Sequence, residues 1–317
     1  MDEDFRALSR LEKPTAVLSS CKDTERVQIK LSENFRAVFY APFYATLALG
    51  FFAREGVDVR LIDSSAPGSA TTGLVDGSID VTWGGPMRVM KSRNEPNAPD
   101  LVCFCEVVRR DPFYLVGRRD RGTFALEELA TLKLASVSEV PTPWLCLQHD
   151  LREIGIDPAR VHRIADRSMP ENLGALERGE IDVAQMFEPF ATQAVRRGLK
   201  ILHAASARGD TSYTTFLATR ASATKNRAAF AAMTSAVGHM QTWLVQHTMQ
   251  ELAATVAPYF GHVPHGDLVD AFARYKAAHL WADSTPVSRA GFDRLAQSLH
   301  SGGFIASVPA YADCVVG

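Results

Sequence analysis

One eight-residue pattern occurs twice in the chain and constrains its fold more than any other feature. Residues 74–81 and residues 176–183 both follow Leu-x-x-Gly-x-Ile-Asp-Val, and the second copy begins 102 residues after the first. This pattern is typical of a helix that ends at a glycine and is followed by a buried strand. We therefore expect the same helix–turn–strand unit at two places in the fold.

A second pair of similar segments lies upstream of the two copies. Residues 54–58 (Arg-Glu-Gly-Val-Asp) resemble residues 152–157 (Arg-Glu-Ile-Gly-Ile-Asp), and an extended segment follows each, at Val59–Ile62 and at Val161–Ile164. Each half therefore reads as helix, glycine turn, strand, helix, glycine turn and strand. Two units of this kind with parallel strands predict an α/β protein with a duplicated architecture.

The length of the chain agrees with two lobes, because 317 residues exceed the ~250 residues at which a single core usually stops growing. The chain would cross twice between the lobes, and two crossings make a hinge with a ligand cleft beside it. The expected parts are a mobile N-terminal segment at 1–27, one lobe from 28–111 with 216–317, and a second lobe from 112–215.

The rest of the sequence predicts further strands and then mainly helices. A helix is expected at Phe43–Arg54, and a tail with little periodicity, Gly302–Gly317, is expected to be coil. Additional strands are expected at 27–31, 101–108, 113–117, 133–137 and 214–219. Additional helices are expected at 228–246, 249–259, 267–280 and 288–300.

Several motifs resemble one known family. Ala41–Tyr44 followed by Gly50–Asp58 resembles the opening of the sulfonate, nitrate, taurine and thiamine-pyrimidine binding proteins of ABC importers. Gly179–Val183 and Phe187–Pro189 are similar to later motifs of that family, and the resemblance covers about residues 28–260. It implies a type II periplasmic-binding fold whose two α/β lobes, joined by a two-strand hinge, close on a small solute.

The resemblance also implies a set of ligand-lining positions at the carboxyl ends of strands. Acidic and aromatic side chains together suit an amine-bearing or heteroaromatic ligand, whereas Arg36 would suit a carboxylate or a sulfonate. Prolines at 141 and 143 lack N–H groups, which argues against a sulfonate at that helix start. The expected positions are Arg36, Phe39, Tyr40, Gly68, Ser69, Trp83, Gly84, Ser138, Glu139, Phe187 and Glu188.

There are two alternatives to a binding protein for transport. One is an enzyme on the same fold, similar to a thiamine-pyrimidine synthase, a desulfinase or a decarboxylase, and the other is a ligand sensor. Cys103 and Cys105 would place both thiols on one face of a strand, but they lack the spacing of a zinc site. His262-Val-Pro-His265 is read as a surface turn rather than a metal site. No catalytic residue, metal or cofactor is therefore predicted.

Charge and cysteine content limit the partners and the compartment. A net charge of −2 gives no electrostatic reason to expect nucleic acid. Five cysteines do not form a disulfide framework, and the first 35 residues hold no apolar run like that of a secretory signal. We expect a monomer that binds a small organic ligand and an ABC permease, cytoplasmic as the sequence stands and periplasmic if the true start lies upstream.

Overall fold

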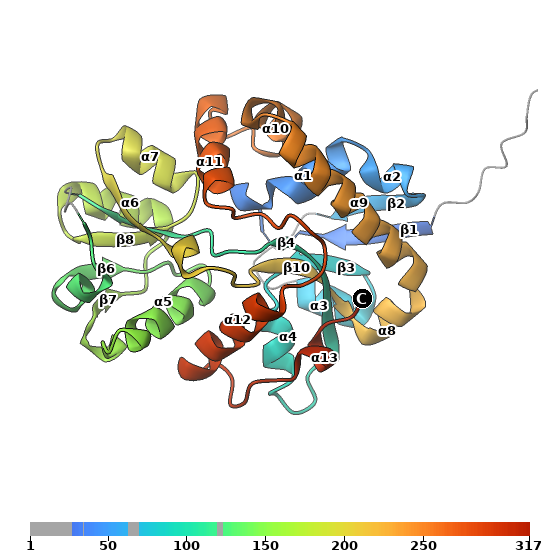
Figure 1. The fold of residues 1–317 in the computed structure, drawn as a ribbon, viewed down its shortest axis with the longest axis horizontal. Helices are drawn as coiled ribbons and strands as arrows, with labels where there is room; N and C mark the ends of the chain where they lie inside the picture. The colour runs from blue at the N-terminus through green and yellow to red at the C-terminus, as the bar shows by residue number, and fades with distance from the viewer. Residues whose placement is uncertain (1–26, 34, 63–69, 119–122) are drawn as a thin grey trace, which may run out of the picture.

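The computed structural model describes residues 27–33, 35–62, 70–118 and 123–317 (Figure 1). The expected mobile N-terminal segment, residues 1–27, lies outside this part of the chain except for Val27. None of the helices in these ranges is long and apolar enough to cross a membrane.

The strands form two five-stranded sheets, one in each half of the molecule in Figure 1. The order of the first sheet is β2-β1-β3-β10-β4, with strands Val57–Ile62, Val27–Ser32, Val81–Gly84, Thr214–Thr219 and Leu101–Val108. The order of the second sheet is β7-β6-β8-β5-β9, with strands His162–Ile164, Lys133–Ala135, Val183–Met186, Tyr114–Gly117 and Lys200–Ala204. The chain therefore passes between the sheets twice, after β4 and before β10.

The two sheets have the same plan. Their third strands, β3 and β8, both begin at the valine of the repeated pattern. β3 pairs parallel to β1 and antiparallel to β10, while β8 pairs parallel to β6 and antiparallel to β5. The expected duplicated α/β architecture is confirmed.

The aspartate of the repeated pattern has the same role in both sheets. The Asp80 carboxylate accepts a hydrogen bond from the backbone N–H of Lys30 at 2.8 Å, and the Asp80 N–H donates to the Lys30 carbonyl at 2.9 Å. Asp182 makes the same two bonds with Lys133, at 2.9 and 3.0 Å. Each aspartate thus fixes the start of its own strand against the neighbouring parallel strand.

We expect Asp80→Ala and Asp182→Ala each to lower the free energy of unfolding by about 1–2 kcal/mol, because each removes one charge-assisted hydrogen bond at a strand edge. Urea unfolding followed by circular dichroism measures the loss. Asp166→Ala is the matched control, since Asp166 is exposed. Losses equal to that of the control would contradict the structural role of the two aspartates.

The helices surround the two sheets, and both copies of the repeated glycine end a helix with a left-handed residue, at φ 76° for Gly77 and 75° for Gly179. The half of the molecule that holds the first sheet contains α1 (Ala41–Ala48), α2 (Phe51–Arg54), α3 (Ala70–Asp76), α4 (Met87–Ser92), α8 (Arg220–Lys225), α9 (Arg227–Gln246), α10 (Met249–Val256) and α13 (Tyr311–Cys314). The others are α5 (Thr142–Glu153), α6 (Met169–Arg178), α7 (Phe190–Arg196), α11 (His265–Ala277) and α12 (Arg289–Ser301).

Three local expectations are wrong. The helix expected at Phe43–Arg54 is two helices, because Gly50 between α1 and α2 adopts φ 70°, which ends the first of them. The tail Gly302–Gly317 is not all coil, since it contains α13. The thiols of Cys103 and Cys105 do not share a face, because a bulge at Cys105 (φ 54°) interrupts the alternation and sends the two side chains into different core clusters.

A buried arginine ties the two crossings together. Arg208, just before the second crossing, forms ion pairs with Asp111 of the first crossing and with Asp150 of α5. Burial alone would lower the pKa of Arg208, but the charges of the two aspartates outweigh it and raise the pKa. The two crossings are therefore held together by a charged cluster with almost no exposure to water.

Candidate ligand-binding site

Loops that follow β1, β6 and β8 line one cavity of about 430 Å³ between the two sheets. The carboxyl ends of the strands therefore supply its walls, as expected for an open α/β protein. Four of the expected site residues line it: Arg36, Glu139, Phe187 and Glu188. The other lining residues are Phe35, Ala37, Val38, Val140, Met169, Pro189, Phe190, Gln193, Phe260, His262 and Val263.

Aromatic rings from the two lobes meet beside this cavity. Phe39, on the 3-10 helix Val38–Tyr40, packs edge-to-face on Phe187 with ring centroids 5.2 Å apart. Phe187 also packs edge-to-face on Phe113 at 5.1 Å and lies 6.3 Å from Phe35. Tyr40 packs on Phe39 at 4.3 Å. An apolar contact between the lobes thus lies beside the cavity, and Phe35 and Phe187 are the rings of this contact that line it.

Arg36 is held at the edge of the cavity by a buried acid. Its guanidinium donates to the Glu33 carboxylate at 2.8 and 3.3 Å, and the Tyr44 hydroxyl donates to the same carboxylate. Burial alone would lower the pKa of Arg36, but the bond and charge of Glu33 raise it. Burial, followed by the Glu33 charge, raises the pKa of Tyr44. Arg36 is therefore a fixed cation whose charge is already balanced.

Glu188 is fully buried, and both of its carboxylate oxygens have protein partners. One oxygen accepts from the backbone N–H of Thr192 in α7, and the other accepts from Nε of Arg274 in α11, both at 2.8 Å. The backbone N–H of Glu188 also donates to the Tyr275 hydroxyl at 3.1 Å. The residue thus fastens the start of α7 to α11, and its charge is balanced there.

Glu139 is the carboxylate in the cavity with the most remaining capacity. It is exposed, and one of its oxygens accepts from the backbone N–H of Met169 at 3.0 Å. A carboxylate offers about four acceptor positions, so a ligand amine can bind beside this bond. The neighbouring Ser138 is exposed and is not among the residues that line the cavity.

The remaining expected positions lie away from the cavity or outside the described residues. Trp83 at the end of β3 is fully buried and stacks on Phe43 with centroids 4.7 Å apart. Gly84 follows it in the same strand, where a Cβ would approach Leu217 to 3.2 Å. Gly68 and Ser69 fall in the segment that the structure does not describe.

Sequence reasoning did not identify several of the lining residues. Phe35 directly precedes the expected position Arg36, and Phe190 directly follows the Phe187–Pro189 motif, so the aromatic character of both is visible in the sequence. Phe260 and His262 come from a distant part of the chain, and the sequence predicted only a surface turn at His262. Nothing in the local sequence of Gln193, on α7, marks it as a site residue.

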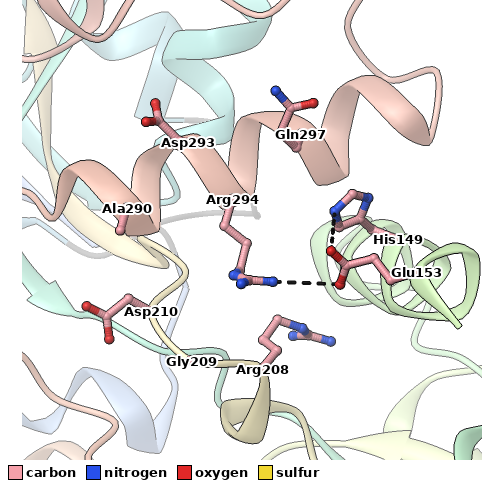
Figure 2. Close-up of a pocket in the computed structure, with 9 residues that line it drawn as sticks. All are labelled: His149, Glu153, Arg208, Gly209, Asp210, Ala290, Asp293, Arg294 and Gln297. Atoms are coloured by element: carbon pink, nitrogen blue, oxygen red, sulfur yellow. Dashed lines mark ion pairs between the residues drawn. The ribbon is translucent and has the colours of Figure 1, made fainter.

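A second cavity of about 490 Å³ lies between α5 and α12, on the opposite side of the crossings (Figure 2). Figure 2 shows Arg294 of α12 pointing toward Glu153 of α5, at 3.8 Å, with His149 on the same carboxylate at 3.6 Å. The Arg294–Glu153 ion pair joins the two helices across the gap, and the described residues of its walls include no phenylalanine, tyrosine or tryptophan. We therefore take the first cavity as the candidate site.

The described cysteines and acidic residues offer little for catalysis or metal binding. Burial raises the pKa of Cys103 and Cys105 and raises the pKa of Cys146 to about 12. These thiols are therefore poor nucleophiles at neutral pH. In the described ranges, no group of three or more histidine, cysteine, aspartate or glutamate side chains is arranged to hold a metal ion.

Comparison with known structures places this geometry in context. SsuA, the periplasmic aliphatic sulphonate binding protein of Escherichia coli, superposes with a TM-score of 0.72 at 15% identity over 89% of this chain and 94% of SsuA. The alkanesulfonate-binding SsuA of Xanthomonas axonopodis pv. citri, bound to MOPS, gives 0.69 at 14% identity over 92% and 98%. The expected two-lobed type II periplasmic-binding-protein-like fold is confirmed.

Sequence comparison identifies the family. YtlA of Bacillus subtilis (strain 168), a binding protein by name, is 23% identical over 269 residues, which cover 84% of this chain and 80% of YtlA. The model of the NMT1-like family matches residues 24–257. Since this match spans most of the chain, the protein belongs to the NMT1-like family.

Proposed function

We propose that the protein binds a small organic solute between its two lobes as the substrate-binding component of an ABC importer. The observation that carries this proposal is the cavity at the strand ends, because both lobes contribute aromatic walls to it. A ligand that contacts both walls would stabilise the closed arrangement of the lobes. The names of the similar proteins, a binding protein and two sulfonate-binding proteins, agree with this role.

We infer that the ligand is an amine-bearing heteroaromatic compound rather than a sulfonate. The aromatic lining suits a flat ring, and Glu139 offers acceptor positions for an amine. The cation Arg36 is balanced by Glu33, so an anionic ligand would have to compete with a buried carboxylate. The sulfonate and the carboxylate are thus the less favoured ligands.

The same proposal includes a division into two lobes joined by a two-strand hinge, one formed by residues 28–111 and 216–317 and the other by residues 112–215. It also includes action as a monomer with an ABC permease. Export to the periplasm would follow from this role. No observation in the site favours an enzyme or a sensor over a binding protein.

Native mass spectrometry of the purified protein, followed by calorimetry, tests the proposed function. The titrants are 4-amino-2-methylpyrimidine, taurine, ethanesulfonate and nitrate. We expect one-to-one binding of the pyrimidine, and at least tenfold weaker binding after Glu139→Ala, because the amine loses a charged acceptor. Failure of all four compounds to bind, with no co-purified small molecule, would overturn the proposal.

A further inference from the structure

We propose that Gln193 and His262 determine the specificity of the cavity by forming hydrogen bonds with the polar edge of an aromatic ligand ring. This inference rests on the proposed function, because it concerns the same cavity between the lobes. It adds two residues that are not among the ligand-lining positions expected from the sequence.

The charged groups of the cavity leave room for such a role. Glu188 is occupied by Thr192 and Arg274, and Arg36 is occupied by Glu33. Charges that are already paired contribute attraction but little discrimination between neutral rings. Glu139 can accept a hydrogen bond from an amine on the ring, and the remaining polar atoms of the ring need uncharged polar side chains in the walls.

Gln193 and His262 are the lining residues that fit this requirement. Both line the cavity, and neither side chain has a hydrogen-bond partner within the described part of the chain. Gln193 lies in α7, three residues after the lining residue Phe190, so both can project from adjacent turns. His262 lies in the loop before α11, two residues after Phe260.

The two side chains approach the cavity from opposite lobes. α7 follows β8 of the second sheet. The loop of His262 belongs with the first sheet, because the ring of Phe260 packs edge-to-face on Tyr44 of α1 with centroids 5.3 Å apart. A ring that bonds to both side chains would link the lobes, which couples recognition to closure.

The chemistry of the two groups defines the ligand class. A carboxamide offers both donors and an acceptor, and a neutral imidazole offers one donor and one acceptor. Gln193 is half-buried and His262 is exposed, and a ring bound between the lobes would cover both side chains. A ligand that fails to pair with these groups would then leave them desolvated and unbonded. The favoured ligand is a six-membered ring with nitrogen atoms in the ring and an amine on it.

Calorimetry with a pair of isosteric probes on the full chain tests the proposal. The probes are 4-amino-2-methylpyrimidine and 3-methylaniline, which has the same shape but no ring nitrogen, and both are titrated under the same buffer conditions. The wild-type protein should bind the pyrimidine at least tenfold more tightly. Gln193→Ala and His262→Ala should each weaken pyrimidine binding about tenfold and change aniline binding by less than about twofold.

Control variants separate specificity from structural damage. His265→Ala changes an exposed histidine three residues further on, which does not line the cavity, and should bind both probes like the wild type. If the wild type prefers the pyrimidine and both test variants keep that preference, the proposed specificity role is overturned and the binding function stands. If the wild type binds neither probe, or binds both equally, the ligand class is wrong and the specificity role falls with it.

Discussion

Replacing Arg208 with methionine is expected to lower the free energy of unfolding by about 3–5 kcal/mol, because it breaks a buried ion-pair cluster. The guanidinium is only 5% exposed, and it pairs with Asp111, which has no exposure, and with Asp150. Removing the cation leaves two buried carboxylates close together without the positive charge that balances them. Methionine fills much of the arginine volume, so the loss of unfolding free energy measures the missing ion pairs rather than the creation of a cavity.

The position of this cluster makes its loss global rather than local. Asp111 lies in the first crossing between the lobes, Arg208 precedes the second, and Asp150 belongs to α5. Asp111 also accepts from the backbone N–H of Phe113 at 3.0 Å. Burial raises the pKa of Asp111 despite the opposing charge of Arg208. Without Arg208 this carboxyl is expected to take up a proton at a still higher pH.

Urea unfolding at pH 7 measures the effect of Arg208→Met. The triple variant Arg208→Met, Asp111→Asn and Asp150→Asn should recover at least half of the loss, because it removes the unpaired charges as well. Arg294→Met is the matched control, since Arg294 is more exposed and its contact with Glu153 is long, at 3.8 Å. A loss below about 1 kcal/mol for Arg208→Met would contradict the role assigned to the cluster.

The duplicated fold could be predicted from the sequence because its signals are local. The glycine ends a helix, and the aspartate directly before the strand binds the neighbouring parallel strand, so the same short pattern occurs in both sheets. Features that depend on pairing between distant strands were not predictable in this way. The bulge at Cys105 arises from the register of β4 against β10, which the alternation of Cys103 and Cys105 alone does not reveal.

The candidate site was predictable only in part, for a related reason. Loops after strands are visible in the sequence, and Arg36, Glu139 and Phe187 do line one cavity. Whether an aromatic residue after a strand faces the cleft or the core depends on the helix packed against it. Trp83 is covered by Phe43 and Tyr44 of α1 and is therefore buried. His262 enters the cavity from a loop far along the chain, which only the tertiary structure brings near.

Phe187 should be the most important aromatic residue for both stability and ligand binding. Its side chain is 5% exposed and contacts Phe39 and Phe113 edge-to-face, at 5.2 and 5.1 Å. Phe187→Ala is expected to lower the free energy of unfolding by about 3–5 kcal/mol, which is usual when a buried phenylalanine is truncated. It also removes a wall of the cavity, so binding of 4-amino-2-methylpyrimidine should weaken at least tenfold.

Phe113→Ala separates these two effects. Phe113 is as deeply buried and packs on the same ring, but it does not line the cavity. Its truncation should cost a similar free energy of unfolding and change pyrimidine binding by less than about threefold, when calorimetry is done at a temperature where both variants are folded. Equal losses of affinity in the two variants would mean that Phe187 acts through the contact between the lobes and not through the ligand. A large loss in Phe187→Ala alone would place the ligand against this ring, because only that variant changes the cavity wall.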